Sequence, residues 1–223
     1  GRPCRLYFAI TNACNRACPW CSVYSRPGLR SFLGADAFVA LLPEEGPFEV
    51  QFEGGEPTLH PELPLMVTVA RATGRCTRVV ICTNGVRWPR DTRRLVDLLR
   101  GFGSPLTIKI SVNHHLFEHD PGLIERAEHL IEAARLVGGA EIVINLRRRR
   151  GGDDDEWLRN LVSDAGLLPW TNDFFLQRYG LASDDEQLQP PHLAGTHFTL
   201  YNPDGSEWGT DLISRSEAMK ELP

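Results

Sequence analysis

Short apolar runs that alternate with helical patterns restrict the fold of this chain more than any other feature. The clearest helical pattern lies between Leu123 and Val137, where apolar residues recur on one face and Gly138 then stops the helix. This alternation is typical of a parallel α/β fold. We predict strands at about 5–11, 48–53, 77–83, 106–113, 141–147 and 173–179, and helices near 35–42, 62–73, 91–100, 122–137 and 155–165.

Composition and charge exclude several classes of partner. The 223 residues are 42% hydrophobic and 24% charged, as in an ordinary globular domain. The net charge of -5 gives no general attraction to phosphate backbones, so nucleic acid is not an expected partner. No apolar stretch approaches the ~20 residues of a membrane span, and no signal-peptide pattern opens the chain. We therefore expect no membrane partner and a cytoplasmic location.

Three of the six cysteines lie close together after the first predicted strand. Cys14, Cys18 and Cys21 follow the spacing C-x3-C-x2-C, which fits a reducing compartment better than a set of disulfides. Soft thiolates suit iron–sulfur centres, and three of them can hold three irons of a cubane [4Fe-4S] cluster. A fourth cysteine at ferredoxin spacing is missing, which leaves one iron open. The alternatives are a zinc knuckle, which usually needs a fourth nearby ligand, and buried structural cysteines.

Polar and flexible residues follow the second and third predicted strands. Gly54 and Gly55 allow a ligand to approach the backbone closely, and Glu56 can accept hydrogen bonds from an ammonium group. Thr83 and Asn84 end the third strand within Thr-Asn-Gly. Both stretches are also ordinary turn signals, so neither motif alone establishes a binding site.

The fourth predicted strand has polar residues at odd positions and apolar residues at even positions. A strand with this period places its polar side chains on one face: Thr107, Lys109, Ser111 and Asn113. In a soluble sheet such a face can simply be hydrated. In a barrel with helices outside, the same face points inward to a ligand, because chemistry in such barrels gathers at the carboxyl ends of the strands.

These motifs resemble the radical S-adenosylmethionine (SAM) superfamily, whose signature C-x3-C-x-aromatic-C has Trp20 at its aromatic position here. The nearest branches are the peptide-maturing and molybdopterin-biosynthesis-like members. The resemblance implies a partial (βα)6 TIM-like barrel of mostly parallel strands over residues 1–182. It also implies that Cys14, Cys18 and Cys21 hold a [4Fe-4S] cluster whose open iron is chelated by SAM. In that family the reduced cluster cleaves SAM to methionine and a 5′-deoxyadenosyl radical, which abstracts a hydrogen atom from the substrate.

The resemblance further implies which residues bind SAM near the second and third strands. Gly54, Gly55 and Glu56 match the family's Gly-Gly-Glu-Pro motif, which binds the amino group of SAM's methionine. Thr83 and Asn84 match a motif that lines the SAM pocket.

Strands four and five supply the other predicted SAM ligands. Ser111 and Asn113 match a motif that hydrogen-bonds the ribose hydroxyls, although many members carry Asp where this chain has Asn113. Asn145 resembles a strand-five asparagine of the related branches. Arg147 can clamp the SAM carboxylate through its planar guanidinium, with Arg149 as the alternative in this run of four arginines.

The candidate catalytic residues are His115 and Tyr179. His115 lies in a predicted loop over residues 114–119, where it can bind substrate, transfer a proton or simply occupy the surface. Tyr179 ends the sixth predicted strand, whose side chains meet substrate in the related enzymes. His115 together with Arg178 can alternatively serve a small metabolite.

Residues 183–223 are predicted to form a short C-terminal extension on the same domain. Phe198 to Trp208 reads as a hairpin that turns at Pro203-Asp204-Gly205, and a helix follows. The hairpin resembles the opening of the cysteine-rich extension of peptide-maturing enzymes. No cysteine occurs after Cys82, so we expect no auxiliary cluster.

The sequence thus predicts a radical SAM oxidoreductase. A peptide substrate is favoured over a small metabolite, because a six-stranded barrel with a short tail leaves a lateral opening. Electrons are expected from a flavodoxin- or ferredoxin-type reductant. A non-catalytic iron–sulfur carrier or sensor would explain the cysteines but leave Glu56, Ser111 and Asn113 without a role. A zinc-stabilised binding module would be colourless and redox-inert.

Overall fold

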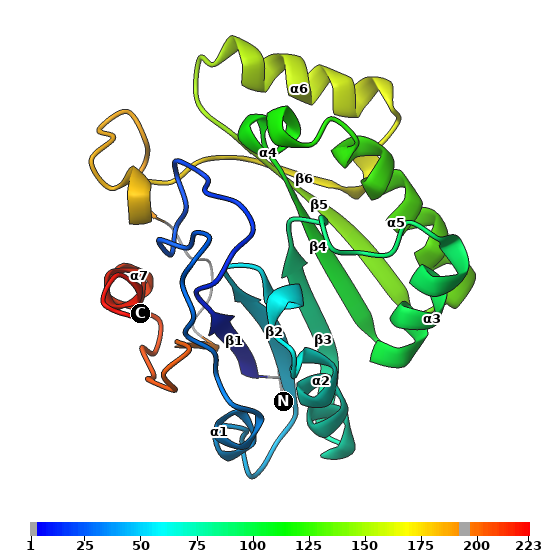
Figure 1. Cartoon of the computed structure of the whole chain (residues 1–223), viewed down its shortest axis with the longest axis vertical. Helices are drawn as coiled ribbons and strands as arrows, with labels where there is room; N and C mark the ends of the chain where they lie inside the picture. Colours follow the sequence, from blue (N-terminus) through cyan, green and yellow to red (C-terminus); the bar gives the residue numbers. More distant parts are fainter. Residues whose placement is uncertain (1–3, 192–196) are drawn as a thin grey trace.

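Seven parallel strands form one sheet in the computed structural model, which describes residues 4–191 and 197–223 (Figure 1). In space the order is β6, β5, β4, β3, β2, β1 and β7. Their bounds are β1 Cys4–Thr11, β2 Phe48–Gly54, β3 Cys76–Thr83, β4 Leu106–Val112, β5 Ala140–Arg148, β6 Thr171–Phe175 and β7 Phe198–Tyr201. Strands β1 to β6 pair in chain order, as in an open βα barrel, and β6 and β7 are its edges.

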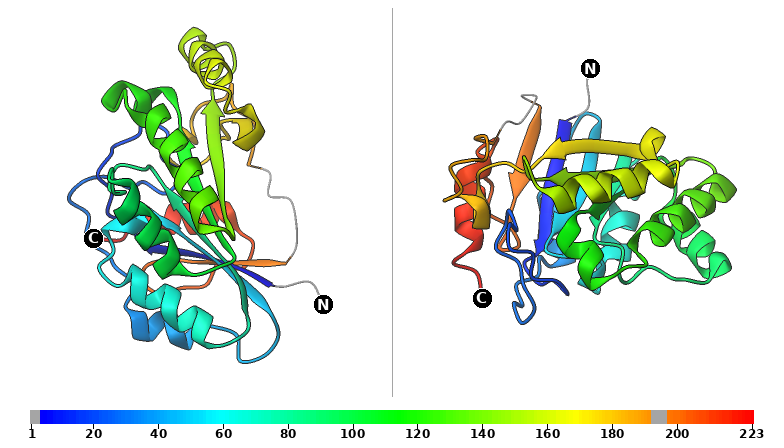
Figure 2. Two further views of the ribbon diagram at one scale, coloured as in Figure 1. Left: turned by 90° about the vertical axis from the view of Figure 1, so that its right-hand side faces the viewer. Right: turned by 90° about the horizontal axis from the view of Figure 1, so that it is seen from above.

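Helices follow most of the strands, as the alternating pattern predicts. Their bounds are α1 Ala35–Ala40, α2 Leu63–Ala72, α3 Thr92–Phe102, α4 His114–His119, α5 Leu123–Val137, α6 Asp153–Asp164 and α7 Leu212–Met219. Helices α2, α3 and α5 lie side by side on one side of the sheet, whereas α7 lies on the other side, beyond β1 (Figures 1 and 2). The side of the sheet away from α2, α3 and α5 is therefore the side on which a ligand site can form.

The hydrophobic core lies between the sheet and the outer helices. Alternate residues of each strand point into it, and Phe8, Phe52, Ile81 and Ile108 have no exposed surface. The predicted apolar face of α5 packs here too, with Leu130 only 1% exposed. Each such side chain contributes about 1.5 to 3 kcal/mol by its burial, which holds the strand ends in register for the site above them.

Two predicted boundaries after the fourth strand are wrong. The predicted loop over residues 114–119 is the short helix α4, because the Asn113 side chain accepts a 2.9 Å hydrogen bond from the Leu116 N–H and caps it. The sixth strand is predicted over 173–179 but spans Thr171–Phe175, since its partner β5 ends at Arg148, which pairs with Phe175. Tyr179 therefore lies beyond the strand.

The predicted C-terminal hairpin is only partly formed. Its turn is present, since Asn202 N–H donates to Ser206 O at 3.0 Å. An isolated bridge between Tyr201 and Glu207 joins its two arms, as do hydrogen bonds of 2.9 Å from Leu200 N–H to Gly209 O and from Trp208 N–H to Leu200 O, although the second arm is not a strand. The first arm is instead β7, which pairs in parallel with β1. Burial explains this pairing, because the Tyr201 ring stacks on Phe8 with their centroids 4.5 Å apart.

The predicted helix of the extension is α7, and Asp211 caps it by accepting a hydrogen bond from Ser214 N–H. Residues 1–3 of the predicted core and 192–196 of the predicted extension lie outside the described residues. Among the residues that are described, no helix has both the length and the apolar character needed to cross a membrane.

Candidate active site

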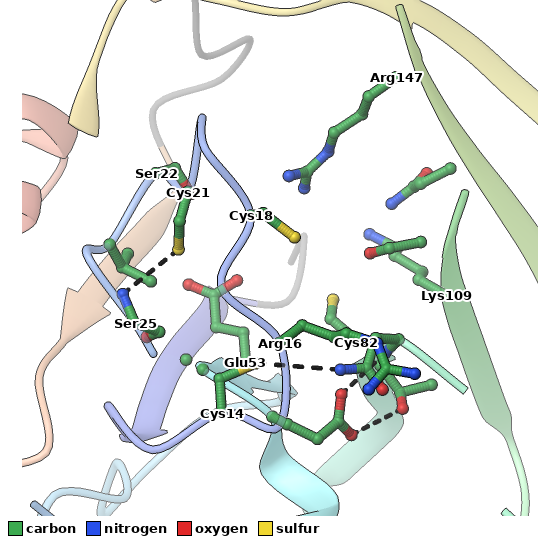
Figure 3. A pocket seen from close by; sticks show the side chains of 18 of the residues that line it. Cys14, Arg16, Cys18, Cys21, Ser22, Ser25, Glu53, Cys82, Lys109 and Arg147 are labelled. Atoms are coloured by element: carbon green, nitrogen blue, oxygen red, sulfur yellow. Dashed lines mark hydrogen bonds between the residues drawn. The ribbon is translucent and has the colours of Figure 1, made fainter. Parts of the chain in front are cut away.

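A cavity of about 300 Å³ lies at the carboxyl ends of the strands, beside the cysteine-containing loop over residues 12–33 (Figure 3). Strands β1 to β5, β7 and helix α7 all contribute to its walls. Every residue predicted to bind metal or SAM lines it: Cys14, Cys18, Cys21, Gly54, Gly55, Glu56, Thr83, Asn84, Ser111, Asn113, Asn145 and Arg147. The fold thus brings together side chains that are as many as 133 residues apart in the chain, the separation of Cys14 from Arg147.

The cysteine loop is held in place by segments far along the chain. Leu181 N–H donates to Cys21 O at 2.9 Å, and the Ser216 hydroxyl of α7 donates to Ser22 O. Gly180 packs so closely that a Cβ on it would lie 2.5 Å from Cys21 O. The loop therefore sits between α7 and the segment that follows β6.

The cysteine sulfurs have donors that suit a metal-bound thiolate. Ser25 N–H donates to Cys21 Sγ at 3.3 Å (Figure 3), and Asn84 Nδ2 approaches Cys14 Sγ at 3.9 Å. Burial raises the pKa of Cys14 to about 12 and that of Cys18 to about 11, so both thiols keep their protons until a metal displaces them.

The three sulfurs line one cavity without converging on a point. Within residues 4–191 and 197–223, no three His, Cys, Asp or Glu side chains stand close enough to hold a metal ion. A cubane cluster places its ligands on separate irons, so it is bound by sulfurs spread around a cavity wall rather than by a tight tetrahedron. The donor set, its N–H contacts and its place on the cavity wall fit a cluster with three protein ligands.

The turn after β2 is packed directly on the cysteine loop. Gly55 N–H donates to Thr11 O at 2.8 Å, and Glu56 N–H donates to Ala13 O at 2.8 Å. A Cβ on Gly54 would lie 2.2 Å from Thr11 O, and one on Gly55 would lie 2.0 Å from Ala13 O. Only glycines permit this approach of two backbones, which sets the distance between the cysteine loop and the strand ends.

Glu56 lies at the centre of a network that joins β2 to β3. Its side chain is 1% exposed and accepts hydrogen bonds from the Thr58 hydroxyl at 2.7 Å, the Thr83 hydroxyl at 2.7 Å and Asn84 N–H at 2.8 Å. Burial raises its pKa, and these hydrogen bonds oppose that shift. Glu56 thus orders the two turns predicted to bind SAM, in addition to lining the cavity.

The predicted ligands on β4 and β5 lie at one level of the sheet. Ser111 is paired in register with Asn145, whose side-chain oxygen accepts a 3.4 Å hydrogen bond from Asn172. Asn113 has its oxygen engaged in capping α4, which leaves its amide N–H₂ as the group available to a ligand.

Among the predicted ligands on β4 and β5, Arg147 is the positively charged one, and it faces the cysteines (Figure 3). It extends toward Cys18 in Figure 3, and its charge lowers the pKa of Cys18 against the larger effect of burial. Its Nε is buried and has no hydrogen-bond partner among the described residues. Arg149, the alternative, points elsewhere, since it forms a 2.8 Å ion pair with Asp155 and stacks over Trp20.

The two candidate catalytic residues are placed differently. Tyr179 lines the cavity, whereas His115 lies on α4 outside its lining, edge-on to Trp20 with ring centroids 6.1 Å apart. Burial lowers the pKa of His115, and the neighbouring His119 adds to the shift. His115 thus contacts the cysteine loop through the ring of Trp20.

Several residues of the cavity were not predicted as site residues. They include Tyr7, Gln51, Glu53, Cys82, Lys109, Leu200, Leu212 and Arg215. The period-two pattern already placed Lys109 on the inner face, and Gln51 and Glu53 alternate in the same way on β2. Arg215 carries no local signal, because only the path of α7 brings it to the cavity.

Relatives with curated descriptions match much of the chain. A GTP 3′,8-cyclase of Stenotrophomonas maltophilia is 32% identical over 202 residues, which cover 80% of this chain and 60% of that protein. A PqqA peptide cyclase of Xanthomonas campestris is 34% identical over 88 residues, which cover 38% of this chain and 23% of that protein. The chain therefore spans at most 60% of the length of these two relatives.

The fold has solved counterparts. SuiB of Streptococcus suis, crystallised with S-adenosylmethionine, superposes with a TM-score of 0.60 over 94% of this chain and 60% of its own, at 14% identity. A model of the radical SAM superfamily matches residues 8–162, which include the three cysteines and all the predicted SAM ligands. The chain belongs to the radical SAM superfamily.

Proposed function

We propose that this protein is an enzyme that cleaves SAM reductively and abstracts a hydrogen atom from its substrate. The observation that carries the proposal is the single cavity lined both by the cysteine triplet and by the strand-end residues predicted for SAM. When bound, a [4Fe-4S] cluster supplies the electron that breaks a carbon–sulfur bond at the sulfonium of SAM and so yields the 5′-deoxyadenosyl radical. Cys14, Cys18 and Cys21 would hold the cluster.

The chain's own residues would bind and orient SAM. We assign the amino group of SAM to the turn of Gly54, Gly55 and Glu56, whose backbone lies against the cysteine loop. Thr83 and Asn84 would fix the neighbouring turn through their bonds to Glu56.

The opposite wall would bind the rest of the molecule. Ser111, Asn113 and Asn145 offer hydroxyl and amide groups for the ribose hydroxyls. Arg147 would pair with the SAM carboxylate, and its unpartnered Nε supports this assignment.

A peptide is the substrate class that we favour. The relative named PqqA peptide cyclase supports it, as does the likeness in fold to SuiB, which has also been crystallised with its precursor peptide SuiA. A nucleotide is the second candidate, because matches to GTP 3′,8-cyclases cover up to 80% of the chain. Tyr179 would face either substrate from the cavity wall, whereas His115, which is not among the lining residues, would act through its contact with Trp20.

The proposal extends to the electron donor of the enzyme, its location in the cell and its domain organisation. The reductant would be a flavodoxin- or ferredoxin-type protein in the cytoplasm. Residues 183–223 would form part of the same domain as the core, since β7 extends its sheet and α7 supports the cysteine loop.

Anaerobic reconstitution with iron and sulfide, followed by dithionite and SAM, tests the function. Formation of 5′-deoxyadenosine is the expected result. A brown protein that leaves SAM intact would instead indicate an electron carrier, and a colourless protein that retains zinc would indicate a binding module. Adding candidate precursor peptides or GTP then separates the substrate classes, because the true substrate should increase the yield of 5′-deoxyadenosine.

A further inference from the structure

The cavity has two levels, and only the upper one is occupied by the predicted SAM ligands. Lys109 lies two residues below Ser111 on β4, which is about 7 Å deeper at the rise of a strand. At that depth Lys109 is in register with Cys82 of β3. The lower level of the same cavity is therefore lined by side chains that the proposed SAM site does not use.

A continuous chain of hydrogen bonds crosses the lower level. Lys109 Nζ donates to Gln51 Oε1 at 2.9 Å, and Gln51 Nε2 donates to Glu53 Oε2 at 2.8 Å. Arg215 of α7 donates to Glu53 Oε1 at 2.7 Å and to Asn202 Oδ1 at 2.8 Å. We name Lys109, Gln51, Glu53 and Arg215 the floor network.

The floor network carries one more positive charge than negative charge. Glu53 is paired with Arg215, whereas Lys109 has no carboxylate within 4.0 Å among the described residues and makes its bond to a neutral amide. An ammonium group on a cavity wall has three donors, and within the described part of the chain one of them is used. Such a group is stabilised by an anion from outside the protein.

We propose that the floor network binds an anionic group of the substrate, a carboxylate or a phosphate, through Lys109. The proposal rests on the proposed function, which assigns the upper level to SAM and so leaves the lower level to the reacting partner. Glu53 and Arg215 are positioning residues: they hold Gln51, and through it Lys109, at a fixed place on the wall. A peptide would supply the carboxylate of an acidic side chain, and a nucleotide would supply its phosphates.

The lysine content of the chain permits a direct test by NMR. The sequence has two lysines, Lys109 in the cavity and Lys220, whose side chain is 47% exposed at the end of α7. Isotopically labelled lysine thus gives two side-chain signals, and Lys220→Arg identifies them. The reconstituted protein with SAM is titrated with Ac-Ala-Glu-Ala-NH2, with its Gln counterpart and with GTP.

The expected result is a shift of the Lys109 signal alone, caused by the Glu tripeptide or by GTP. The charged tripeptide should bind at least about tenfold more tightly than its Gln counterpart, and Lys109→Met should remove that preference whereas Lys109→Arg keeps it. A response to the Glu tripeptide indicates a carboxylate ligand, and a response to GTP alone indicates a phosphate ligand.

Equal shifts with the Glu and Gln tripeptides, or no shift with any of the three, would overturn the proposal. Cleavage of SAM is measured on the same sample. If SAM is not cleaved although the Lys109 signal shifts, the proposed function fails while the anion site stands.

Discussion

Arg215 on the last helix and Glu53 at the end of the second strand form an ion pair of 2.7 Å across 162 residues of sequence. The Arg215 side chain is 3% exposed and that of Glu53 is 21% exposed. This pair joins the C-terminal segment to the sheet on the floor of the cavity, and it makes α7 a structural part of the site.

Arg215→Met should destabilise the protein by about 2 to 3 kcal/mol, because it leaves the Glu53 carboxylate in a largely buried place without its cation. Urea unfolding measures the change. The double variant with Glu53→Gln should recover part of the loss. Arg78→Gln, which breaks the exposed pair with Glu141, is the control and should change stability by at most about 0.5 kcal/mol.

Cys18→Ala should abolish both the cluster and the cleavage of SAM, because two thiolates cannot hold three irons. Iron and sulfide content and the yield of 5′-deoxyadenosine provide the measurement. Cys76→Ala is the matched control, since Cys76 begins β3 at the end far from the cavity. If the Cys18 variant still cleaves SAM, the assignment of the cysteines is wrong.

Gly55→Ala should destabilise the protein by about 2 kcal/mol, because the new Cβ would meet the backbone oxygen of Ala13, which no side-chain rotation can relieve. Gly101→Ala in α3 has open space around it and should instead stabilise the protein by about 0.5 kcal/mol. Thermal and urea unfolding of both variants compare the two. A Gly55 variant as stable as the wild type would contradict the close packing of this turn on the cysteine loop.

Asp173→Asn should cost stability at neutral pH and little in strong acid. Burial alone would raise the pKa of Asp173, but hydrogen bonds from Arg148 and Arg159 outweigh burial and lower it. A carboxylate with a lowered pKa in the folded state stabilises that state fully above the unfolded value of about 3.9, and the contribution disappears as the pH falls through the folded value. Unfolding free energies of wild type and variant should therefore begin to converge as the pH falls below about 4, and the charge contribution should be gone below the folded pKa of Asp173. A constant difference across the whole range would show that the pair's charge contributes nothing.

Sequence reasoning found the upper level of the site because that level is built from short local motifs. Gly54 and Gly55 lie at the end of β2, and Thr83 ends β3. Parallel strands bring their carboxyl ends to one edge of the sheet, so strands in the right order are enough to gather these residues. Hydrophobic periodicity predicts where the strands lie, and the resemblance to the radical SAM superfamily implies their order in a barrel. The prediction therefore needed no knowledge of side-chain contacts.

The remainder of the site depends on long-range packing, which leaves no local pattern. Phe198 to Tyr201 alternates well enough for a strand, but the pattern does not show that it also pairs with β1, where Tyr201 stacks on the ring of Phe8. The end of β6 was misplaced because its length is set by Arg148 on β5 and not by its own residues. Arg215 reaches the cavity because α7 packs beside β7.

The support of the cysteine loop by Gly180 and Ser216 has a practical consequence for engineering. Residues 8–162 match the family model, yet the hydrogen bonds that the backbone oxygens of Cys21 and Ser22 accept come from beyond that range. A chimera that grafts residues 8–162 onto a different tail should assemble its metal centre poorly unless the segment around Gly180 and all of α7 are transplanted with them.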